Sequence, residues 1–208
     1  MSTDASTWHK ALPFIVLAPM AAVKNGSLIS LAIVVLTLLI VKSSRRPTLA
    51  FRGPGLAKGL ALGIGVGIAL WAFSQFLMDP MLERLFGKID LTNFAAVRGN
   101  VKNYLILLAA GLIYGGMIEE IISRGFVIGW GTALFGERAE IPLLLLSTLV
   151  FGLAHRYQDT AGMISTGVSG LVFGVVYLVG GRKLMPAMLA HATADAIGIT
   201  GIYLGYGG

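Results

Sequence analysis

The organisation of this chain is decided by the stretch LILLAAGLIYGGMIEEIISRGFVIGW, residues 105–130. The stretch is apolar on both sides of two adjacent carboxylates, Glu119 and Glu120, and it carries one cation, Arg124. An apolar run of this length predicts a helix that crosses a bilayer. Charged side chains inside such a helix are costly, so a functional site is their default explanation. A functional site is therefore expected at the two glutamates.

The composition of the chain is that of a membrane protein. Of its 208 residues, 56% are apolar and only 12% are charged, and the mean hydropathy is +0.81. The 16 Lys and Arg residues exceed the 10 Asp and Glu residues, but they gather at the ends of apolar runs, where they set the orientation of spans. Nucleic-acid binding is therefore rejected. With no cysteine, the chain has no disulfide, no thiol catalysis and no thiolate zinc site.

Apolar segments account for most of the chain and predict an all-α, polytopic bundle with about seven transmembrane helices, within a range of six to eight. We expect them to form one integral membrane domain covering residues 1–208. The first segment is short and holds Pro13 and Pro19, so it is expected to lie in the interface or to form part of a span. The segments are 11–24, 26–41, 59–78, 103–135, 141–157, 162–180 and 184–204.

The charges between the segments predict a multi-pass protein of the cell membrane with a definite orientation. The linker from Lys42 to Lys58 holds five basic residues, including Arg52, and no acid, which indicates the cytoplasmic face. Residues 79–102 carry both signs and are expected to form an extracytoplasmic connector with a short amphipathic helix. The loops at 137–138 and 182–183 then lie inside, and the loop at 157–160 lies outside.

Glycine recurs every fourth residue in two of the segments. Gly59, Gly63 and Gly67 are spaced in this way, and so are Gly170 and Gly174. Small residues at this spacing form the faces on which membrane helices pack closely. No strand or polar turn precedes them, so we interpret them as packing positions and not as a phosphate-binding loop.

Within its helix, Glu120 is placed to pair with Arg124. The two residues are four apart and share a helical face, whereas Glu119 points about 100° away. We therefore expect Glu120 and Arg124 to neutralise one another and to leave Glu119 available as a general base. The competing interpretation is that both acids belong to a structural ion network.

Two histidines in later spans carry partners at helical spacing. Phe151 and His155 are four apart, and His191 and Asp195 are four apart, so each pair shares a face. Asp195 is therefore expected to orient the imidazole of His191. Counted at 1.5 Å per residue from the cytoplasmic loops, Glu119 and His155 lie at ~24 Å and ~21 Å, but His191 lies at only ~12 Å. The depth of His191 therefore matches poorly unless tilt or a kink at Pro186 corrects it.

The set Glu-Glu-x-x-x-Arg, Phe-x-x-x-His and His-x-x-x-Asp, in this order, resembles the CPBP family of intramembrane proteases, which includes CAAX-processing and bacteriocin-processing enzymes. The resemblance covers roughly residues 103–204, the expected catalytic core, and residues 1–102 would supply further spans and the connector. It implies an endopeptidase without metal or other cofactor, acting on a membrane-associated, leader or CAAX-like peptide. It implies that Glu119 and His155 activate a water, and that His191 and Asp195 stabilise the oxyanion. Where the family has Asn at the last position an amide can donate, but ionised Asp195 cannot.

Three other interpretations stay open at this stage. A zinc enzyme could use the same acids and histidines, although the helical His-Glu-x-x-His pattern of zincins is absent. A rhomboid-type serine protease is suggested by Gly-x-Ser-Gly at Ser169, a weak match in a glycine-rich chain. Intramembrane acids and histidines also build proton relays, so a proton-coupled transporter or a non-proteolytic membrane scaffold is the alternative outside the enzymes. The sequence does not name the substrate or the oligomeric state.

Overall fold

The computed structural model describes residues 7–23, 26–51 and 55–206. The structure is 88% helical, and no strand occurs in these residues. The expected fold class, an all-α polytopic membrane bundle, is confirmed. Arg52 of the basic linker lies outside the described residues.

The first half of the chain forms short helices followed by one long one. The uncertain first segment is two short helices, α1 and α2, with Pro13 inside α1 and Pro19 inside α2. The long helix runs without interruption from α5 through η1 into α6, so the connector's amphipathic helix is its extension. The elements are α1 (Thr7–Ile15), α2 (Leu17–Ala22), α3 (Gly26–Ile40), α4 (Lys42–Thr48), α5 (Leu56–Phe73), η1 (Ser74–Met78), α6 (Asp79–Phe86) and η2 (Thr92–Val97).

The second half contains the helix of the two glutamates. That helix is continuous over Val101–Phe135. It changes from α-type to wider π-type turns and back along its length. The elements are α7 (Val101–Ala110), η3 (Gly111–Glu119), η4 (Ile121–Trp130), α8 (Gly131–Phe135), η5 (Glu137–Ala139), α9 (Glu140–Ala154), η6 (Arg156–Gln158), α10 (Asp159–Val179) and α11 (Leu184–Leu204).

Four of the described helices are long and apolar enough to cross a membrane. They are Ala57–Phe86, Val101–Phe135, Arg156–Val179 and Leu184–Leu204. The other apolar segments are helical but shorter: α3 and α9 have 15 residues each, which corresponds to ~22 Å against a hydrocarbon core of ~30 Å. The sequence-based count of about seven therefore holds for apolar helical segments, whereas only four have full spanning length.

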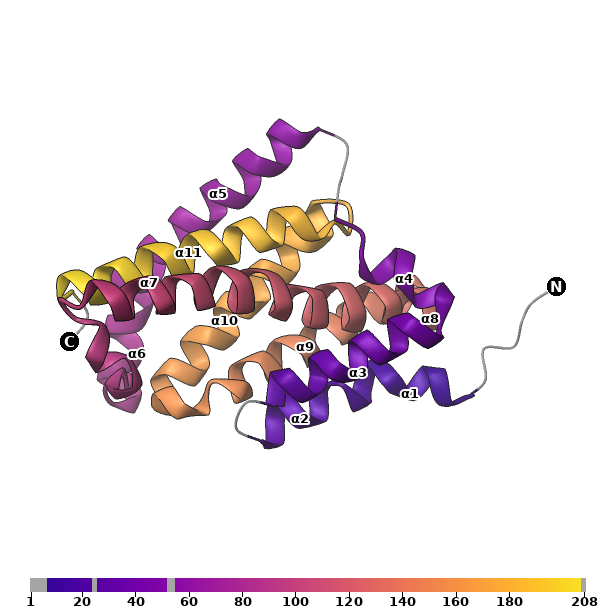
Figure 1. Cartoon of the computed structure of the whole chain (residues 1–208), viewed down its shortest axis with the longest axis horizontal. Coiled ribbons are helices and arrows are strands. Elements are labelled where there is room, and N and C mark those ends of the chain that lie inside the picture. The colour runs from indigo at the N-terminus through magenta and orange to yellow at the C-terminus, as the bar shows by residue number, and fades with distance from the viewer. Residues whose placement is uncertain (1–6, 24–25, 52–54, 207–208) are drawn as a thin grey trace.

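Glycines bring α5 against α11. A Cβ on Gly63 would lie 2.6 Å from the carbonyl oxygen of Pro186, and one on Gly67 would lie 2.6 Å from that of Ala190. In Figure 1, α5 crosses the yellow helix α11, which runs beside the long helix containing α7. The predicted packing role of these glycines is confirmed, because any side chain at either position would push the two helices apart.

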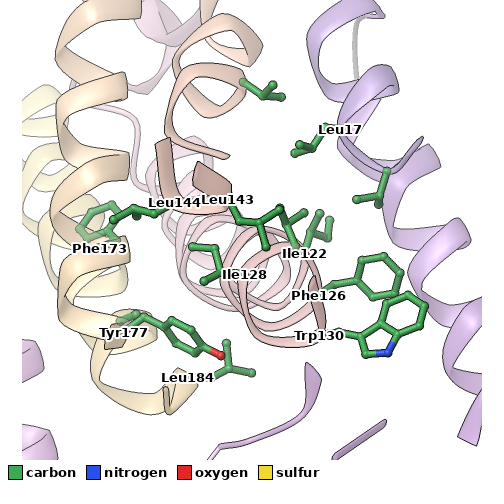
Figure 2. Close-up of a cluster of buried hydrophobic side chains, with 14 of the residues drawn as sticks. Leu17, Ile122, Phe126, Ile128, Trp130, Leu143, Leu144, Phe173, Tyr177 and Leu184 are labelled. Carbon is green, nitrogen blue, oxygen red and sulfur yellow. The ribbon is translucent and has the colours of Figure 1, made fainter. Parts of the chain in front are cut away.

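A second set of contacts forms the core around η4. Figure 2 shows Ile128 with Leu143 and Leu144 of α9, beside Phe173 and Tyr177 of α10. On the other side Phe126 and Trp130 point toward the first helices of the chain. The shared core places η4 between α9, α10 and the N-terminal helices. The charged residues near its middle are consequently enclosed by protein.

Loops gather at the two ends of the bundle as the charge pattern predicts. At one end Arg182 pairs with Glu140 at 2.5 Å, and the amide of Leu184 donates to the carbonyl of Ala50. At the other end the amide of Asp90 donates to the carbonyl of Gln158, and that of Gly99 donates to the carbonyl of Tyr203. The basic linker and the connector therefore lie at opposite ends, as a threaded multi-pass chain requires.

Candidate active site

Glu119 and Glu120 lie where two π-helical segments, η3 and η4, adjoin. Glu119 is 6% exposed and Glu120 is fully buried. Wide i→i+5 turns are rare in helices and are frequent at functional sites. The backbone is thus unusual at the position where the sequence places its costliest side chains.

The predicted pair of Glu120 and Arg124 is present. Nη1 of Arg124 donates to Oε1 of Glu120 at 3.0 Å, and both side chains are almost completely buried. Nη2 of Arg124 donates to the carbonyl oxygen of Gly170 on α10. The guanidinium also lies over the ring of Phe151, 4.9 Å from its centroid, which is a cation–π contact. Arg124 therefore ties η4 to α9 and α10.

His191 is bound by Glu120, which corrects one expectation. Nδ1 of His191 lies 2.9 Å from Oε1 of Glu120, the same oxygen that accepts from Arg124. Oδ2 of Asp195 is 3.6 Å from Nε2 of His191, which is ion-pair distance but too long for a hydrogen bond. The hydrogen bond expected from Asp195 is thus formed by Glu120, and Asp195 lies at ion-pair distance from the other ring nitrogen.

The register of α11 corrects the expected depth of His191. Leu184, the first residue of α11, packs near Gly125, and Asp195 packs near Gly115. Tyr104 meets Thr200 still further along, with 3.1 Å between their hydroxyl oxygens. The helix therefore begins deep, level with the middle of η4. The depth estimate of ~12 Å for His191 assumed that α11 begins at the same level as the other helices. Because α11 begins deeper, His191 reaches the level of the glutamates without a kink at Pro186.

His155 caps the end of α9 and has a defined hydrogen-bonding state. Its Nδ1 lies 2.9 Å from the carbonyl oxygen of Phe151, four residues earlier. A carbonyl can only accept, so Nδ1 carries the hydrogen and Nε2 is left as an acceptor in the neutral ring. Phe151 packs against both histidines, with ring centroids 5.2 Å from His155 and 5.8 Å from His191.

Two cavities meet at these residues. The connector cavity, about 550 Å³, opens between the α2–α3 turn, the connector and the start of η6. The bundle cavity, about 440 Å³, lies between η3, α5, α10 and α11. Glu119 and His155 line both, and His191 and Asp195 line the bundle cavity. The structure thus brings four of the six predicted residues to the cavity walls, and it buries Glu120 and Arg124 behind them.

Gly115 shapes the wall of the bundle cavity. A Cβ at this position would lie 2.6 Å from Oδ2 of Asp195 and 3.2 Å from Nε2 of His191. Only a glycine allows this approach of η3 to the two side chains. The contact of Gly115 with Asp195 and His191 could not be predicted from the sequence, because it depends on the register of α11.

Tyr114, Phe94 and Tyr157 line both cavities and were not among the predicted residues. Tyr114 precedes Glu119 by five positions, a spacing that places two side chains on different faces of an α-helix. The π-type turns of η3 link residues five apart and bring them to the same side. The period assumed for the helix is the reason that Tyr114 was missed.

The structure also places the residues on which a zinc enzyme or a serine protease would depend. Within the described part of the chain, no group of three or more His, Asp or Glu side chains is arranged to hold a metal ion. Ser169 lines the bundle cavity, and its hydroxyl donates to the carbonyl oxygen of Ser165 in its own helix at 3.1 Å.

Residues 101–197 match the family model of the type II CAAX prenyl endopeptidase Rce1-like proteins. The match confirms, over this region, the predicted resemblance to the CPBP family of CAAX proteases. No curated protein and no solved structure matches the chain significantly. All the predicted site residues lie inside the matched region. Proteins of this family are peptidases that act on peptide or protein substrates in membranes, so the match supports a membrane peptidase.

Proposed function

We propose that the chain is an intramembrane endopeptidase that hydrolyses a peptide bond with a water activated by Glu119 and His155. The observation that carries the proposal is the unequal use of the two glutamates. Glu120 is occupied by Arg124 and His191, whereas none of the described residues forms a hydrogen bond or an ion pair with Glu119. Glu119 faces the cavities with its carboxylate available.

Glu119 and His155 each present a hydrogen-bond acceptor at the cavity, and together they can bind one water molecule. The carboxylate of Glu119 and Nε2 of His155 can each accept one hydrogen of a water, which leaves an oxygen lone pair directed at a carbonyl carbon. In the proposed step Glu119 takes a proton from the water as its oxygen bonds to that carbon. The same proton then passes to the amide nitrogen as the carbon–nitrogen bond breaks, giving an acid and an amine.

The negative oxygen formed in this step needs a donor, and His191 can supply one. Glu120 orients the ring through Nδ1, and Nε2 faces the cavity beside Asp195. A ring that donates from both nitrogens is an imidazolium, whose charge the adjacent carboxylates compensate. Such a preorganised donor stabilises an oxyanion in a water-poor site.

We assign residues 103–204 to the catalytic core and residues 1–102 to the spans and connector that complete a single integral domain of the cell membrane. The substrate is a membrane-associated, leader or CAAX-like peptide. Both cavities reach the catalytic residues beside the connector, at the end assigned to the extracytoplasmic side. The basic linker, whose charges define the cytoplasmic side, lies at the other end.

The proposal is tested by looking for cleaved peptides in membranes that hold the intact protein and in membranes that hold Glu119→Ala. We expect products that depend on Glu119 and that mass spectrometry identifies as peptides with new termini. A transporter or a scaffold would also respond to mutation of Glu119, but it would release no new termini. Their absence with a folded protein would contradict the proposal.

Asp195 offers a test of the oxyanion side. Asp195→Asn is expected to keep substantial activity, because an amide occupies the same space and can itself donate to the oxyanion. Asp195→Leu places neither a polar group nor a hydrogen-bond donor beside His191, so it is expected to lower kcat by about a hundredfold or more. The measurement is kcat for both variants on one peptide, with folding checked for each. If Asn is as damaging as Leu, the negative charge itself is required.

A further inference from the structure

The bundle cavity has the opposite charge balance from the chain. The chain carries 16 Lys and Arg residues against 10 Asp and Glu residues, yet none of the Lys and Arg residues that the structure describes lines this cavity. Three carboxylates do: Asp79, Glu119 and Asp195. Glu119 and Asp195 belong to the proposed catalytic group. Asp79 has no place in that chemistry.

Asp79 is a fixed carboxylate on the wall formed by α6 and α10. It begins α6 and is half-buried. Its Oδ1 accepts a hydrogen bond of 2.6 Å from the hydroxyl of Ser165 on α10. None of the ion pairs among the described residues includes Asp79. A carboxylate removed from water without a cation is costly, so a partner of positive charge would satisfy it.

We propose that Asp79 is a specificity-determining residue that binds a cationic group of the peptide substrate, either a Lys or Arg side chain or an N-terminal ammonium. The inference rests on the proposed function, since it assigns the substrate class of the same site. A peptide in the bundle cavity lies along a wall that holds Glu119 and Asp79 together. Its cation would form a charge-assisted hydrogen bond with Asp79.

The same cavity disfavours negative groups. A glutamate side chain near Asp79 would meet a like charge, and none of the described Lys or Arg residues is in the wall to offset it. Much of the remaining wall is apolar, with Leu70, Leu107 and Ile199 among its residues. The substrate class is therefore an apolar peptide that carries one positive charge near the bond that is cleaved.

The test uses the full-length protein in liposomes of neutral lipid and a synthetic apolar peptide in which one position at a time is Lys, Gln or Glu. Each peptide is made with a free and with an acetylated N-terminus. We expect kcat/KM to be about tenfold higher for Lys than for Gln at one position, and lower still for Glu, as a hydrogen bond to a charged group predicts. If Lys and Gln peptides are cleaved alike and acetylation of the N-terminus lowers kcat/KM instead, the ammonium is the cation that binds.

Two variants of Asp79 isolate its charge. Asp79→Asn keeps the acceptor for Ser165 but loses the charge, so the preference should disappear while the Gln peptide is cleaved as before. Asp79→Glu keeps the charge and should retain the preference. Asp90→Asn is the matched control: Asp90 also accepts from a hydroxyl, that of Thr92 at 2.6 Å, and it lies half-buried on the connector outside both cavities. This bond lowers the pKa of the Asp90 carboxyl, so the control also removes a negative charge.

The outcomes separate this inference from the proposed function. Glu119-dependent cleavage of all peptides at equal rates, or a preference that survives in Asp79→Asn, would overturn the role of Asp79 and leave the protease intact. An equal loss of the preference for Lys peptides in Asp90→Asn would also overturn the role of Asp79. The preference would then come from the overall electrostatic field of the protein and not from a contact with Asp79. No cleavage of any peptide by the folded protein would overturn the proposed function itself.

Discussion

Glu119→Gln is expected to lower the rate of peptide hydrolysis by about a thousandfold while the protein stays folded. The amide has the shape of the carboxylate but cannot accept a proton from water. Because no described residue is bonded to Glu119, the substitution breaks no observed contact in the structure. The measurement is kcat on one peptide in liposomes, together with the melting temperature in detergent.

Two other variants make this result specific. Glu137→Gln changes an exposed glutamate that pairs loosely with Arg182 at 3.6 Å, and it should leave both activity and melting temperature unchanged. Ser169→Ala should retain activity, since its hydroxyl is bonded within its own helix and no serine nucleophile takes part. Normal turnover by Glu119→Gln would remove the glutamate mechanism. Inactivation by Ser169→Ala would instead favour the serine alternative.

The features that could be predicted from the sequence depend on short-range geometry. Hydropathy identified the apolar segments, because a bilayer requires runs of fixed length. Helical spacing identified the Glu120–Arg124 pair, which the structure shows at 3.0 Å. Spacing also placed Gly63 and Gly67 on one packing face, and both meet α11. Each inference needed only residues that are close in the sequence.

The features that escaped prediction depend on how separate helices are aligned. His191 meets Glu120 because α11 begins beside Gly125, and no local pattern fixes that level. Glu120 therefore forms the hydrogen bond to His191 that helical spacing led us to expect from Asp195. Asp79 reaches the bundle cavity because α5 continues into α6 and packs on Ser165, a contact between residues 86 positions apart. Long-range packing decides these positions.

The shared oxygen of Glu120 connects the stability of the bundle with the proposed chemistry. Oε1 accepts from Arg124, which contacts α9 and α10, and it lies at hydrogen-bond distance from His191 on α11. Four elements therefore depend on one carboxylate. Its other oxygen and Nε of Arg124 have no partner among the described residues, which makes the network costly to maintain. Such a cost is consistent with retention for function.

Glu120→Gln is accordingly expected to destabilise the protein by about 3–5 kcal/mol, because it leaves the buried charge of Arg124 without compensation. The exposed fractions decide this magnitude: 2% for the side chain of Arg124 and 0% for that of Glu120. The measurement is the free energy of unfolding in a denaturant titration, with Glu137→Gln as the exposed control. Melting of Glu120→Gln like the parent protein would show that the pair does not stabilise the bundle.

A double variant separates the two roles of Glu120. In Glu120→Gln with Arg124→Met, the buried charge is gone together with its partner, so much of the lost stability should return. Activity should stay low, because an amide holds His191 without the charge that supports an imidazolium. Recovery of stability without recovery of kcat would assign Glu120 a positioning role toward His191. If kcat returns together with stability, Glu120 acts on the reaction only by keeping the helices together.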